Sequence, residues 1–166
     1  MEPAERTRTF EAWLSAHGAI LERTARGFAS GADRDDLLQE LLLAVWKAVP
    51  AFRAGAQVST FLYRVAHNAA LTWWRGRHRR GEREAPLELA DGAAAAPPSS
   101  DEARLARLYA AIHALPPLDR SLVLLSLDDV SYAEMATLHG LTPSNVGARL
   151  TRARQALAAT LRGEHE

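Results

Sequence analysis

Apolar side chains recur along this chain every three or four residues, which is the period of an amphipathic helix, and no segment shows the alternation typical of a strand. The pattern predicts an all-α fold. Three helices are expected in the first half: one over about residues 9–29, one that Asp33 caps, and one that starts near Ser59. Residues 50–57 are expected to form the loop before the third helix.

The second half predicts further helices over about residues 101–114 and 118–127, followed by two more in the segment described next. Residues 81–100, between the halves, are rich in Ala, Pro, Gly and acids and lack a sustained period, which predicts a flexible linker. The expected organisation is a small helical domain over residues 1–80, this acidic linker, and a second small helical domain over residues 101–166.

The segment that begins at Ser131 predicts two short helices joined by a tight turn. Ser131 and Glu134 match a capping box, which closes the first turn of a helix. Gly140 stands where a left-handed residue would end that helix, because only glycine takes positive φ without penalty. Thr142 can cap the second helix, and Pro143 suits its first position.

These two helices have distinct faces. The expected apolar face comprises Tyr132, Met135, Ala136 and Leu138 on the first helix and Val146, Leu150, Ala153, Leu157 and Leu161 on the second. Asn145, Ala148, Arg149 and Arg152 fall on a different face of the second helix. A helix-turn-helix presents such a face to the DNA major groove. The alternative is an ordinary helical hairpin with a solvated basic face.

Composition limits the class of protein. The chain has 166 residues, of which 48% are apolar, and this is enough for a hydrophobic core. It has no cysteine, which excludes disulfides and thiolate metal sites, and no apolar run near the ~18 residues of a membrane span. The charged N-terminus does not match a secretory signal, so we expect a soluble, cytoplasmic protein without membrane insertion.

The six histidines are scattered, and no metal-site, P-loop, nucleophile-elbow or dinucleotide-binding spacing occurs. We therefore expect no metal, no cofactor and no enzymatic activity. A small helical enzyme that uses scattered histidines and carboxylates is the enzymatic alternative, and a metal assay would test most of it.

The formal net charge is zero, but the charges are unevenly distributed. Residues 1–80 hold 12 basic and 8 acidic residues, whereas residues 81–103 hold 1 basic and 6 acidic residues. No acid occurs between Glu40 and Glu82, although 7 basic residues lie there. Such a block can neutralise phosphates, which indicates a nucleic-acid partner.

Residues 61–80 place aromatics beside arginines and one asparagine. Aromatic faces can stack on unpaired bases and arginines can bind the backbone, so the segment suits a protein that holds separated strands. The alternative is that the aromatics are core and the arginines form a solvated helix end. The acids Asp33, Asp35, Asp36 and Glu40 are similarly open to two interpretations: favourable charges at a helix start, or a protein-docking face.

Two groups of short runs occur in a fixed order. The N-terminal group comprises residues 35–40, Trp46, Phe52, residues 59–68 and the basic run from Arg75 to Arg80. The C-terminal group comprises residues 115–117, Arg120, residues 131–136, residues 140–142 and residues 149–154. Together they resemble the two conserved domains of bacterial sigma factors of the extracytoplasmic-function (ECF) subfamily, over about residues 10–162.

The resemblance implies a transcription initiation factor that binds core RNA polymerase and directs it to promoter DNA. It implies that the polymerase docks on Asp35, Asp36, Gln39 and Glu40. It implies that the −10 element is engaged and opened by Asn68, Trp73, Trp74, Arg75, Arg77, Arg79 and Arg80. It implies that the −35 element meets Ser144, Asn145, Arg149 and Arg152. The sequence does not say whether an anti-sigma factor is a further partner.

Phe61, Thr72 and the pair Gly147-Ala148 differ from residues that are frequent in the family, and a glycine inside a helix costs about 1 kcal/mol relative to alanine. These differences concern the choice of promoter. The alternative function is a stand-alone helix-turn-helix regulator, which would need a dimer interface and a palindromic site. The asymmetric two-domain layout argues against it.

Overall fold

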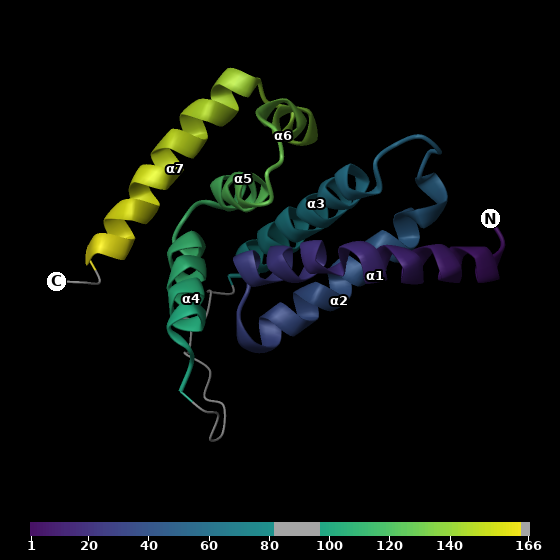
Figure 1. Ribbon diagram of the computed structural model, residues 1–166, viewed down its shortest axis with the longest axis horizontal. Helices are drawn as coiled ribbons and strands as arrows, with labels where there is room; N and C mark the ends of the chain where they lie inside the picture. The colour runs from purple at the N-terminus through teal and green to yellow at the C-terminus, as the bar shows by residue number, and fades with distance from the viewer. Residues whose placement is uncertain (82–96, 164–166) are drawn as a thin grey trace. The chain divides into compact units, whose positions relative to one another are not determined.

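The computed structural model describes residues 1–81 and 97–163, in which every regular element is a helix (Figure 1). The all-α prediction is therefore confirmed. Contacts within the chain divide it into two units, Met1–Arg83 and Glu84–Glu166. Most of the predicted linker over residues 81–100 lies outside the described residues. No helix in the described part of the chain is both long enough and apolar enough to cross a membrane.

The N-terminal unit is built from three long helices that pack against one another (Figure 1). Its elements are α1 (Pro3–Phe28), α2 (Gly31–Ala48), the short 3-10 helix η1 (Val49–Ala51) and α3 (Val58–Arg79). Aliphatic side chains from all three helices are fully buried between them, as for Leu21, Leu41 and Leu62. Each aliphatic side chain buried in this way stabilises the fold by about 1.5–3 kcal/mol.

An aromatic cluster closes one part of this core. The rings of Trp13, Phe52 and Phe61 meet edge to face with centroids 5.1–5.7 Å apart. Such pairs contribute about 0.5–1.5 kcal/mol beyond the area that they bury. Phe61, which differs from the residue frequent in sigma factors, is therefore a core residue that holds the start of α3 against α1.

The first helix begins at Pro3 rather than near Thr9, where it was predicted to begin. Arg6 explains the longer helix, because its Nε and Nη2 donate to the Trp46 carbonyl oxygen at 2.9 and 2.7 Å. Its guanidinium also lies 4.5 Å from the centroid of the Trp46 ring. These contacts fasten the first turns of α1 to the last turn of α2, where a cation is favourable.

The prediction that Asp33 caps the second helix is wrong. The chain turns at Gly31, which has φ +57°, and α2 begins there with Ser30 at the N-cap position. Asp33 therefore lies inside the first turn, where a carboxylate is favoured by the helix dipole. Its side chain pairs with Arg77 of α3, as described below.

Four helices form the C-terminal unit: α4 (Ser100–His113), α5 (Pro117–Leu127), α6 (Tyr132–His139) and α7 (Pro143–Gly163). A capping box opens α4: Ser99 Oγ accepts from the Glu102 amide and the Glu102 carboxylate accepts from the Ser99 amide, both at 3.2 Å. Buried Arg120 closes the other end of α4 by donating to the carbonyl oxygens of His113 and Leu115. This arrangement satisfies carbonyls that a helix end leaves free.

The helix-turn-helix is confirmed in its main details. Ser131 Oγ accepts a hydrogen bond from the Glu134 amide at 3.1 Å, but the described residues show no return bond to the Glu134 side chain, so the predicted capping box is only half formed. Thr142 Oγ1 accepts a hydrogen bond from the Asn145 amide at 3.1 Å, as predicted. Gly140 ends α6 in the left-handed conformation, with φ 66° and ψ 35°. Pro143 is the first residue of α7, as predicted.

Packing of α7 on α4, α5 and α6 buries one stripe of this helix. The buried residues are Val146, Leu150, Ala153 and Leu157, while Leu161 is half-buried. The prediction that Tyr132 belongs to the buried apolar face is wrong, because this residue is 41% exposed. The ring instead covers Gly147, and a Cβ added to that glycine would lie 3.5 Å from Tyr132 Cε2.

Alanine substitution at two glycines should change stability in opposite directions. Gly140→Ala is expected to lower the free energy of unfolding by about 1–2 kcal/mol, because the added Cβ is strained at positive φ. Gly147→Ala should raise it by up to about 1 kcal/mol, because alanine favours a helix and its Cβ would make only ordinary contact. Urea unfolding followed by far-ultraviolet circular dichroism measures both, and a loss of stability in Gly147→Ala would contradict the described packing.

Candidate polymerase and nucleic-acid interfaces

The acidic side of α2 is exposed. Asp35, Asp36, Gln39 and Glu40 are all solvent-exposed, while Leu37 between them is fully buried. Positions three and four apart lie on one helix face, so these four side chains form a continuous surface. Asp33 is separate from this acidic surface because it is engaged with α3.

Arg77, near the end of α3, contacts two partners at once. Its Nη2 lies 3.0 Å from Asp33 Oδ1, and its guanidinium lies 4.8 Å from the centroid of the Trp73 ring. The two charged side chains are only 22% and 33% exposed, so water screens this pair less than an ordinary surface pair. Asp33 therefore holds Arg77 against Trp73.

Trp74 is covered in a similar way. Its ring stacks on His78 with centroids 3.5 Å apart and planes 20° from parallel, and His78 Nδ1 lies 3.0 Å from the Trp74 carbonyl oxygen. Trp73 and Trp74 are both half-buried. Each tryptophan is thus covered by a side chain four residues later on α3: Trp73 by Arg77 and Trp74 by His78.

The remaining candidates on α3 are open to solvent. Asn68, Arg75, Arg79 and Arg80 are exposed, and no acid lies on α3 itself. The helix therefore presents a positively charged face that also carries the Asn68 side-chain amide, and its arginines can neutralise phosphates.

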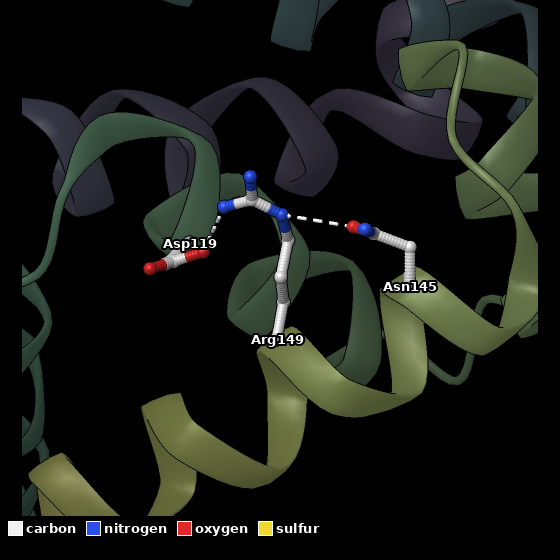
Figure 2. A network of polar contacts seen from close by, with 3 residues as sticks. All are labelled: Asp119, Asn145 and Arg149. Atoms are coloured by element: carbon white, nitrogen blue, oxygen red, sulfur yellow. Dashed lines mark hydrogen bonds and ion pairs between the residues drawn. The ribbon is translucent and has the colours of Figure 1, made fainter.

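On α7, the four candidates share the exposed side of the helix. Ser144, Asn145 and Arg152 are exposed and Arg149 is half-buried. Figure 2 shows that Arg149 lies between two acceptors: its Nε donates to Asn145 Oδ1 at 3.0 Å and its Nη1 to Asp119 Oδ1 at 3.2 Å. Arg154 on the same helix is used within the unit, since it donates to Ser126 Oγ at 2.8 Å.

Sequence reasoning missed Asp119 and the pairing of Asp33 with Arg77. Both aspartates stand in the first turn of a helix, which is where acids are common for reasons of helix charge. Nothing local distinguishes an aspartate that reaches an arginine 30 residues away from one that does not. Within the described ranges, no group of three or more His, Asp or Glu side chains is placed to hold a metal ion.

Two family models match this chain, one in each of the two units. A model of sigma-70 region 2 matches residues 13–80, and a model of sigma-70 region 4 matches residues 105–157. The RNA polymerase sigma factor CnrH of Cupriavidus metallidurans is 32% identical to this chain, over 96% of this chain and 90% of CnrH. This chain belongs to the RNA polymerase sigma factor family.

A second relative places this sigma factor in the ECF subfamily. The ECF RNA polymerase sigma factor EcfG of Rhodopseudomonas palustris is 31% identical, over 85% of this chain and 78% of EcfG. The fold is also that of RpoE in its complex with the anti-sigma factor NepR from Bartonella quintana, with a TM-score of 0.73. That match has 22% identity and covers 93% of this chain and 98% of RpoE.

The sigma factor is thus a transcription initiation factor that binds core RNA polymerase and directs it to promoter DNA, as the resemblance implied. The alternative of a stand-alone helix-turn-helix regulator is not favoured, because the family matches include region 2 as well as the helix-turn-helix.

Arg77→Ala should destabilise the N-terminal unit by about 1 kcal/mol, because it removes both the Asp33 ion pair and the contact with Trp73. Urea unfolding followed by tryptophan fluorescence reports on this unit, since all 4 tryptophans lie within residues 13–74. Arg79→Ala is the matched control: it removes an exposed arginine nearby and should change stability by less than about 0.5 kcal/mol. Equal effects of the two substitutions would contradict a structural role for the Arg77 contacts.

Proposed function

We propose that the acidic surface of α2 docks core RNA polymerase. The observation that carries this assignment is the exposure of Asp35, Asp36, Gln39 and Glu40 on a helix whose opposite side is fully buried. Ionised side chains held in one place on a rigid helix give a partner a fixed pattern of charge to match. A basic surface on the polymerase is the complementary partner.

The C-terminal part of α3 is proposed to engage the −10 element. Arg75, Arg79 and Arg80 would neutralise phosphates, and Asn68 would contact an exposed base edge. Trp73 and Trp74 would offer ring faces to unpaired bases. Arg77 lies over the Trp73 ring and His78 over the Trp74 ring. When a base binds, Arg77 and His78 would either move away from these rings or stay on one ring face while the base stacks on the other.

The exposed side of α7 is proposed to enter the major groove at the −35 element. Ser144 and Asn145 lie in the first turn of this helix, and Arg149 and Arg152 follow on the same side. A helix-turn-helix contacts base edges mainly through the N-terminal residues of its second helix. Arg152, which is exposed, is suited to the phosphate backbone.

Two such contacts on one chain strengthen each other through effective concentration. Either domain alone would bind promoter DNA weakly, and the polymerase would set the distance between them. The factor itself would carry out no catalytic step and would act beside the polymerase in the cytoplasm. The RpoE structure contains an anti-sigma factor, and an inhibitory partner of that class is proposed for this chain as well.

The decisive experiment mixes the purified full-length chain with core polymerase. We expect co-elution in gel filtration, and initiation at specific sites on genomic DNA only when both are present. A chain that elutes separately from core polymerase at micromolar concentrations would overturn the proposal.

Glu40→Lys should weaken binding to core polymerase about tenfold or more, because it reverses a charge within the acidic surface. Glu22→Lys reverses an exposed charge on α1 of the same unit and serves as the control, with binding expected to stay within about twofold of the original chain. Fluorescence anisotropy of a labelled chain titrated with core polymerase measures both. Equal loss in the two variants would indicate a non-specific effect of charge.

Arg152→Ala should weaken holoenzyme binding to promoter DNA with little change in sequence preference, and should reduce the slope of log K against log salt by about one. The control is Arg162→Ala, which removes an exposed arginine from the last turn of the same helix. Filter binding at several salt concentrations measures both slopes. An unchanged slope for Arg152→Ala would remove this residue from the proposed interface.

A further inference from the structure

Arg149 is the only proposed −35 contact whose charged group is held by side chains from two helices within the described part of the chain. Asn145, one turn earlier on α7, accepts from Nε at 3.0 Å. Asp119, on α5, accepts from Nη1 at 3.2 Å. Figure 2 shows the guanidinium between these two side chains, which lie on opposite sides of it.

This arrangement leaves one edge of the guanidinium open. In Figure 2 Nη2 points away from both Asp119 and Asn145, and among the residues that the structure describes no hydrogen-bond partner is found for it. An arginine recognises guanine with two N–H groups that point the same way. The second hydrogen of Nη1 and one hydrogen of Nη2 form such a pair, because Asp119 and Asn145 use the other corners of the plane.

Asp119 is itself firmly placed. It lies in the first turn of α5, where the helix dipole favours a carboxylate, and Pro117 begins that helix. The following residues Leu122 and Leu125 are fully buried and anchor α5 in the core of the unit. The side chains of Asp119 and Arg149 are 20% and 33% exposed, so their attraction is less screened than that of a surface pair.

We propose that Asp119 is a positioning residue for promoter recognition: it orients Arg149 so that the open edge of its guanidinium faces the base edges of the −35 element. This inference rests on the proposed role of α7. A long side chain that is already ordered gives up fewer rotamers on binding, which is worth about two- to tenfold in affinity. Affinity increases only for the base that fits the fixed orientation of Arg149. Asp119 would therefore increase sequence specificity without contacting DNA.

A different role for the same carboxylate makes the opposite prediction. If Asp119 restrained Arg149 from reaching DNA, or repelled phosphates, its neutralisation would strengthen binding to every sequence. The contacts favour positioning, because the negative charge of Asp119 is paired with the guanidinium while Nη2 stays available.

The test uses holoenzyme assembled from core polymerase and the full-length chain, with a DNA library randomised over the −35 element. Sequences recovered with the original chain define the preferred bases, and Arg149→Ala identifies the position that depends on Arg149. Asp119→Asn should lower the preference at that position by about two- to tenfold and leave the other positions unchanged. The salt dependence of binding should also stay unchanged, because no phosphate contact is lost.

Two controls separate positioning from a loss of folding. Asp101→Asn removes a carboxylate of the same unit whose contact with Arg104 is long, at 3.8 Å, and highly exposed, so preferences should not change. The double variant Asp119→Asn/Arg149→Ala should behave like Arg149→Ala alone, since Asp119 has no route to the DNA except through Arg149.

Each other outcome overturns the inference. Stronger binding of Asp119→Asn to all sequences would show that Asp119 restrains Arg149 from reaching DNA. An equal loss of base preference at every position of the −35 element would show that Asp119 has a structural role only. An unchanged preference at the Arg149 position in Asp119→Asn and also in Asp119→Ala, which lacks the oxygen that accepts from Nη1, would show that Asp119 does not orient the guanidinium, while leaving the proposed function intact. If the original chain recovers no −35 preference although it binds core polymerase, the proposed role of α7 fails together with this inference.

Discussion

Burial of one stripe of α7 is the constraint on which the helix-turn-helix depends. Val146 and Leu150 are completely buried, and the 3.6-residue period then forces Asn145 and Arg152 toward the outside. In proteins most of the stability of an amphipathic helix comes from packing of its apolar face, so this packing supplies much of the stability of α7 as well as its orientation. Gly140 allows α6 to end at the angle that this packing needs, because the left-handed turn is open to glycine.

The same relation between a buried stripe and an exposed face holds for α3 in the N-terminal unit. Its first half is anchored by Phe61 and Leu62 in the core. Its last turns carry the half-buried tryptophans and the exposed arginines, which the core orients without covering completely. A site built on a rigid helix places its side chains more precisely than a site built on a loop.

In each unit, an aspartate from the first turn of one helix holds an arginine of another: Asp33 holds Arg77, and Asp119 holds Arg149. Each pair holds a basic side chain in place, and in the proposed interfaces this would order the side chain before nucleic acid binds. The chain has zero net charge, and in the proposed interfaces part of its acidic charge would orient basic groups rather than oppose DNA binding.

Local chemistry made much of this protein predictable from its sequence alone. Helix periods, the capping box at Ser99, the glycine at 140 and the proline at 143 depend on residues within four positions of each other, so a short window contains the whole cause. The start of α1 was missed because a distant residue intervened: Arg6 extends the helix by reaching Trp46. The start of α2 was missed for a local reason, since the chain already turns at Gly31. Only the tertiary structure decided that Tyr132 covers Gly147 and that Asp119 meets Arg149, because these contacts depend on how helices pack, and no local pattern encodes that geometry.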